Sequence, residues 1–178
     1  MLDFIRAYEN YLTKVKQASQ NTISSYMRDI RQFSQLLNST ENVDVIDATQ
    51  QNIADYLAHL EDTGKTGATV SRSLASLKNF YAYVVSSGFL EKTPVMDIHV
   101  SRGDKKMPQI LTSREIEMLL SQPVCVDAKG FRDKAMLEVM YATGIRVTEL
   151  IDLNIDDVNL EQGIIKCNNA KKTRIIPM

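Results

Sequence analysis

The stretch "YATGIRVTEL" (Tyr141–Leu150) places an arginine among apolar residues, directly after a glycine that can end a helix. If a helix runs through it at about 100° per residue, Arg146 shares a face with Leu150 and Leu153. Arginine is rarely buried without a partner, and Glu149 lies three residues further on, within reach. Two hypotheses follow: a buried Arg146–Glu149 ion pair, or a guanidinium held by Glu149 for an anion such as phosphate.

The segments around this stretch predict helices followed by a β-hairpin. Upstream, "FRDKAMLEVMYATG" (131–144) is apolar almost all round, which predicts a helix buried on several sides. Before it, "REIEMLL" (114–120) predicts a helix capped by Thr112 or Ser113. Downstream, "GIIKCNN" (163–169) and "TRIIPM" (173–178) predict two paired strands.

The first half of the chain has a purely helical pattern. Apolar residues at i, i+3 and i+4 predict four helices within residues 1–88, the last ending at Gly88. Prolines, Gly103 and charged residues interrupt any periodicity between 89 and 111, which predicts a linker. Aromatic residues at helical spacing are interpreted as core rather than as a base-stacking platform: Tyr26, Phe33, Phe80, Tyr81 and Tyr83.

Composition sets broad limits on the class of protein. The 178 residues are 44% hydrophobic and 24% charged, which is ordinary for a globular protein. No apolar run is long enough to cross a membrane and no secretion signal opens the chain, so we expect a cytoplasmic protein. Cys125 and Cys167 lack metal-ligand spacing and are expected to be reduced thiols. A net charge of −1 argues weakly against a nucleic-acid coat protein but does not exclude DNA binding.

The order of residues over most of the chain resembles the tyrosine site-specific recombinases of the phage integrase family, with an architecture nearest to the Xer group. "ATGIRVTELIDLNIDDVNLEQGIIK" (142–166) is similar to the family's first catalytic box, and "PQILTSREIEMLL" (108–120) to the entry into its catalytic domain. "SQNTISSYMRDIRQF" (19–33) and "VSRSLASLKNFYAYVVSSG" (70–88) are similar to its SAM-like core-binding domain. The resemblance implies a mainly α protein: a SAM-like four-helix domain at 1–88, a linker at 89–111, and the first part of an α+β catalytic domain at 112–178.

The resemblance implies DNA strand exchange through a 3′-phosphotyrosyl intermediate, without a metal or other cofactor. Arg146 would be the first of two arginines that clamp the scissile phosphate, and Glu149 would support it. The family also places a lysine in the hairpin turn, where its usual sequence is Gly-Lys-Gly. Here the turn reads "NNAKKTR" (168–174). A rigid alignment puts Asn169 at the lysine position, a one-residue deletion puts Lys171 there, which we prefer, and Lys172 is the alternative.

The implied partners are a double-stranded DNA recombination site and other recombinase protomers, which in full-length relatives assemble as tetramers on DNA. Without the resemblance, each candidate DNA contact would be interpreted as part of a solvated surface. The candidate contacts are Thr22, Ser25 and Arg28; Thr66, Thr69, Arg72 and Lys78; Lys105 and Lys106 of the linker; and Lys172 and Arg174 of the hairpin.

The family's His-x-x-Arg box and nucleophilic tyrosine follow the arginine box, and neither occurs between Leu150 and Met178. We therefore expect a chain that is incomplete within the catalytic domain and cannot cleave DNA. Chromosome-dimer resolution and mobile-element integration both stay open as tasks of the full-length protein. The competing interpretations are a non-catalytic DNA-binding or regulatory fragment with the recombinase fold, and a helical adaptor for protein interactions.

Overall fold

The computed structural model describes residues 3–100, 107–168 and 173–178. Residues Met1–Lys106 and Met107–Met178 form two compact units, and each is described by itself. The fold is mainly helical with one small antiparallel sheet, as the sequence predicts. Among the described residues, no helix combines the length and the apolar character that crossing a membrane requires.

The N-terminal unit is built from the predicted four helices. The first is α1 (Phe4–Asn10), which continues into a π-helical turn, η1 (Tyr11–Val15). The others are α2 (Gln20–Thr40), α3 (Gln50–Asp62) and α4 (Gly67–Ser86). A serine or threonine fixes the start of each of these three, because its hydroxyl accepts a hydrogen bond from the backbone N–H three residues on: Ser19, Thr49 and Thr66.

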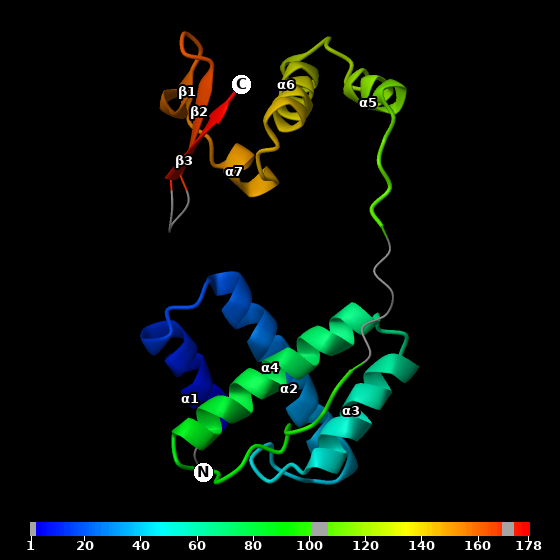
Figure 1. Cartoon of the computed structure of the whole chain (residues 1–178), viewed down its shortest axis with the longest axis vertical. Helices are drawn as coiled ribbons and strands as arrows, with labels where there is room; N and C mark the ends of the chain where they lie inside the picture. The colour runs from blue at the N-terminus through cyan, green and yellow to red at the C-terminus, as the bar shows by residue number, and fades with distance from the viewer. Residues whose placement is uncertain (1–2, 101–106, 169–172) are drawn as a thin grey trace. The chain divides into compact units, whose positions relative to one another are not determined.

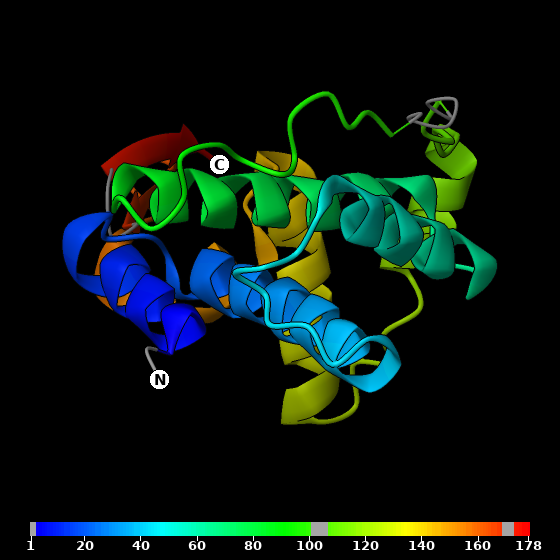
Figure 2. The ribbon, with the colours of Figure 1, turned by 90° about the horizontal axis from the view of Figure 1, so that it is seen from below.

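The apolar faces of these helices meet in one core. Figure 1 shows α4 crossing α2, with α1 toward one end of the crossing and α3 toward the other. Phe33, Phe80 and Tyr81 are fully buried there, which confirms their interpretation as core residues. The segment after α4 belongs to the same core: it runs back along that helix (Figure 2), where Val95 and Ile98 are buried.

In its described residues, the C-terminal unit contains three α-helices and a three-stranded antiparallel sheet in the order β1-β2-β3. The predicted hairpin is confirmed, with Cys167 opposite Arg174 in its register. The sequence pattern missed β1, because two residues carry no recognisable alternation. The elements are α5 (Ser113–Leu120), α6 (Ala128–Thr143), α7 (Val147–Ile151), the 3-10 turn η2 (Ile155–Asp157), β1 (Val158–Asn159), β2 (Ile164–Asn168) and β3 (Thr173–Pro177).

The predicted burial of the helix now seen as α6 is wrong. None of its residues is buried, and Phe131 and Tyr141 are both 61% exposed. Its inner side packs through Val139 and Met140 on a small cluster formed by Ile145, Ile165 and Cys167. In the described chain, the neighbouring elements cover only part of its circumference, so an all-round apolar sequence leaves apolar side chains in contact with water.

Gly130, in the first turn of α6, is required for close packing. A Cβ at this position would lie 1.9 Å from the carbonyl oxygen of Val124, far inside van der Waals contact. We expect Gly130→Ala to destabilise the C-terminal unit by about 1–3 kcal/mol, although alanine normally favours a helix. Urea unfolding measures this loss, and Ala135→Gly, at an exposed site of the same helix, measures the helix-propensity term alone. A stabilised Gly130→Ala variant would contradict the expectation.

Candidate anion-binding site

Arg146 lies at the start of α7 and not within a continuous helix. Gly144 adopts a left-handed conformation (φ 63°) and ends α6, as the sequence predicts. Arg146 then has an extended backbone (φ −73°, ψ 146°) and is the N-cap residue of α7. The prediction that it lies on an apolar helix face is therefore wrong, because it assumed a helix that already includes this residue. Its side chain is 67% exposed.

Glu149 holds Arg146 in place from the first turn of α7. Its side chain is only 2% exposed, although it carries a negative charge. One carboxylate oxygen accepts a hydrogen bond from the backbone N–H of Arg146 at 3.0 Å, and the other accepts one from the Arg146 Nη1 atom, also at 3.0 Å. The Arg146–Glu149 pair expected from the three-residue spacing is confirmed. The carboxylate thereby caps the helix and orients the guanidinium with a single group.

Arg174 reaches the same carboxylate from β3. Its Nη1 and Nη2 atoms each donate to a different oxygen of Glu149, both at 2.7 Å, which is the bidentate arrangement. Sequence reasoning assigned Arg174 to DNA binding and missed this pair. One signal was present: strand alternation places Arg174 and Ile176 on the same side, and an inward-facing arginine requires a partner.

The Cys167 thiol lies beside this cluster on the neighbouring strand. It is buried, and burial raises the pKa of the thiol above its ordinary value. The negative charge of Glu149 raises that pKa further, whereas the positive charge of Arg174 opposes the shift. The thiol therefore stays protonated at neutral pH and is a poor nucleophile. Cys125 and Cys167 are both free cysteines.

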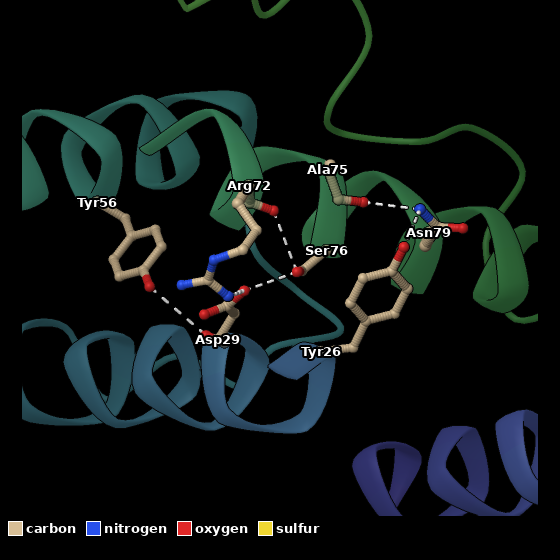
Figure 3. Close-up of polar contacts among 7 residues, drawn as sticks. All are labelled: Tyr26, Asp29, Tyr56, Arg72, Ala75, Ser76 and Asn79. Carbon is tan, nitrogen blue, oxygen red and sulfur yellow. Dashed lines mark hydrogen bonds and ion pairs between the residues drawn. The ribbon is translucent and has the colours of Figure 1, made fainter. Parts of the chain in front are cut away.

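A second buried acidic residue, Asp29, has contacts with three helices of the N-terminal unit. Figure 3 shows Arg72 and Ser76 of α4 both reaching the carboxylate of Asp29 on α2, through an ion pair and a 2.7 Å hydrogen bond from the hydroxyl. Tyr56 of α3 approaches the backbone carbonyl of Asp29 at 3.5 Å. Sequence reasoning did not single out Asp29. Because the Arg72 side chain is 39% exposed, its predicted role in DNA binding stays a prediction.

Several of the remaining candidate residues lie at the beginnings of two helices. Thr22 is in the first turn of α2, with its hydroxyl 2.8 Å from that of Ser19. Thr66 caps α4, with its hydroxyl 3.0 Å from that of Thr69. Ser25 and Arg28 follow on α2; Lys78, on α4, donates to the carbonyl of Ile98 at 3.1 Å. Four predicted residues lie outside the described part of the chain: Lys105, Lys106, Lys171 and Lys172.

The described residues contain no cluster of three or more His, Cys, Asp or Glu side chains suited to a metal ion. In the described part of the chain, the site around Arg146 contains two guanidinium groups and one carboxylate. Its exposed part is cationic, and its planar N–H donors fit the oxygens of a phosphate or another carboxylate.

Comparison with family models identifies the family of both units. Residues 5–88 match the phage integrase N-terminal SAM-like domain, and residues 109–178 match the phage integrase family. The chain belongs to the phage integrase family of tyrosine recombinases.

Named relatives place the chain among Xer-like proteins. It is 34% identical over 181 residues to tyrosine recombinase XerD of Staphylococcus epidermidis, covering 100% of this chain and 61% of the relative. A Caldanaerobacter subterraneus protein whose name places it among the tyrosine recombinases is 41% identical over 168 residues, which are 94% of this chain and 57% of that protein. The chain thus spans about three fifths of the length of these relatives.

Solved structures share the fold. A lambda integrase dimer bound to a COC′ core site aligns with a TM-score of 0.74 at 20% identity, over 98% of this chain and 47% of that one. The Tn1549 transposon integrase in complex with circular intermediate DNA aligns with a TM-score of 0.69 at 19% identity, over 100% of this chain and 61% of that one.

Proposed function

We propose that this chain binds duplex DNA and supplies the first catalytic arginine for site-specific recombination through a 3′-phosphotyrosyl intermediate. The observation that carries the proposal is the state of Arg146: an exposed guanidinium whose position is fixed by a buried carboxylate. Strand exchange is phosphoryl transfer, which depends on positioning and on charge stabilisation at the non-bridging oxygens. A preorganised donor of this kind typically contributes about 10²–10³ to the rate.

The proposal assigns the other predicted residues by family resemblance. Lys171 would protonate the leaving 5′-oxygen, with Lys172 as the alternative. The helix starts of α2 and α4 would contact the phosphate backbone, since hydroxyls and single basic residues suit close approach. The partners would be a duplex recombination site and further recombinase protomers in the cytoplasm. A lambda integrase tetramer bound to a Holliday junction shares the fold, which supports this assembly as a proposal.

Titration with a fluorescent DNA duplex at several salt concentrations tests the binding. We expect affinity to fall as salt rises, because each neutralised phosphate adds about −0.9 to the slope of log affinity against log salt. Arg146→Ala should weaken binding about tenfold and make that slope less negative by about 0.9. Arg132→Ala removes an exposed arginine that pairs with its neighbour Asp133 and should change little. Salt-independent binding, or none, would refute the proposal.

We further propose that the 178 residues alone form no covalent link to DNA. By resemblance, the nucleophile is a tyrosine that follows a His-x-x-Arg box, and both follow the arginine box. His99 does begin a His-Val-Ser-Arg string (99–102), but it precedes Arg146, so it does not match that box in order. A protein–DNA adduct that survives denaturing electrophoresis would contradict this expectation.

The departure of the hairpin turn from Gly-Lys-Gly favours a second candidate function, a DNA-binding or regulatory role without strand transfer. The two functions differ in what Arg146 does. The first function requires DNA cleavage, lost on Arg146→Ala, when this chain is joined to a segment that carries a His-x-x-Arg box and a tyrosine. The second requires that such a protein bind the duplex without cleaving it, whichever residue stands at position 146.

A further inference from the structure

We propose that Arg174 is a positioning residue, which acts through Glu149 to hold Arg146 ready for a phosphate and does not itself bind DNA. The inference rests on the proposed function, because it concerns how the same arginine is presented. It reassigns Arg174 from the role of DNA contact that the sequence suggested.

The two arginines use the shared carboxylate differently. Arg174 commits both terminal nitrogens to Glu149, one to each oxygen, at 2.7 Å. Among the described residues, Arg146 commits only Nη1 of its side chain, at 3.0 Å, together with its backbone N–H. In the described structure, the Nη2 atom of Arg146 is thus left for a ligand, whereas both terminal nitrogens of Arg174 are occupied by Glu149. The exposed fractions agree, at 67% for Arg146 and 38% for Arg174.

Competition for the carboxylate gives Arg174 its effect. A guanidinium beside a carboxylate favours the bidentate arrangement, in which both terminal nitrogens are consumed. Arg174 already fills that arrangement on Glu149, so Arg146 is restricted to a single side-chain bond. Without Arg174, both terminal nitrogens of Arg146 would bind the Glu149 carboxylate, and neither would be oriented toward a phosphate.

Charge acts in the same direction. Glu149 is buried and negative, so alone it would cancel the positive charge of Arg146 and repel a phosphate nearby. Among the described residues of this cluster, two guanidiniums share this one carboxylate, and an excess of positive charge faces solvent. Because Arg174 lies on β3 and Glu149 on α7, the arrangement also depends on the hairpin packing against the helix.

A double-mutant cycle on DNA affinity tests the inference in the full chain. The variants are Arg174→Gln, Arg146→Ala and both together, each titrated with the same duplex. We expect Arg174→Gln to weaken binding about tenfold when Arg146 is present and less than about twofold when Arg146 is already alanine. Arg174→Lys keeps the countercharge without the fork, and its affinity should lie between those of wild type and Arg174→Gln.

Three outcomes would overturn the inference. Equal losses in both backgrounds would mean that Arg174 binds DNA directly. Unchanged affinity of Arg174→Gln or Arg174→Lys, with a lower urea midpoint, would mean that Arg174 is only structural. A wild-type chain without DNA binding would remove the proposed function as well, which distinguishes that failure from the first two. A matched control cycle uses Arg132→Gln in place of Arg174→Gln. In this cycle, Arg146→Ala should weaken DNA binding by the same factor whether residue 132 is arginine or glutamine.

Discussion

Glu149→Gln is expected to make the Cys167 thiol react with a labelling reagent about a hundredfold faster under native conditions. The substitution removes the charge that two arginines share and leaves both without their buried counterion. Breaking such a pair typically costs about 3–5 kcal/mol, and the lower end applies because both arginines are partly exposed. A loss of about 3 kcal/mol raises the open population by roughly two orders of magnitude. Cys167 is buried next to the cluster, so its labelling reports that opening.

The labelling experiment is carried out with Cys125 replaced by serine, so that a single thiol reacts. Glu117→Gln removes an exposed carboxylate from the same unit and should change the rate by no more than about twofold. A rate for Glu149→Gln close to that of the control would show that the carboxylate does not stabilise the C-terminal unit.

Asp29→Asn should lower the free energy of unfolding of the N-terminal unit by about 2–3 kcal/mol. Asparagine has nearly the same shape, but it removes the charge that Arg72 pairs with and changes the acceptor of the Ser76 hydroxyl. Urea unfolding followed by helical circular dichroism measures the loss. Asp55→Asn is the matched control, since Asp55 is exposed and an amide can still accept from Gln51. A difference below about 0.5 kcal/mol between the two variants would contradict the importance of the buried carboxylate.

How much the sequence predicts differs between local and non-local features. The four helices, the glycine that ends α6 and the hairpin follow from patterns within a few residues of one another, and all were predicted. The Arg146–Glu149 pair could also be predicted from the sequence, because a spacing of three residues in a helical turn brings side chains together. The exposure of the Arg146 side chain could not be predicted from the sequence, since a helical wheel does not show at which residue the helix starts.

Contacts between distant segments explain the remaining failures. Glu149 and Arg174 are 25 residues apart, and Asp29 and Arg72 are 43 apart. Periodicity identifies which face of an element is buried, but it does not identify which charged groups meet across two elements. Both arginines therefore resembled free surface cations in the sequence. The prediction that α6 is buried failed for a related reason. An apolar sequence favours burial, but it does not show whether other elements of the chain cover the helix.

Because α7 is short, the orientation of Arg146 is coupled to the formation of this helix. Five residues form too short a helix to persist alone in water. Its first turn is closed by the same carboxylate that orients Arg146. Helix formation and ligand binding are consequently linked equilibria: an anion that engages the oriented guanidinium must also shift the backbone of Val147–Ile151 toward the helical state. The amide hydrogens of this single turn would then exchange more slowly in the complex, and the short helix would report occupancy of the site without contacting the ligand.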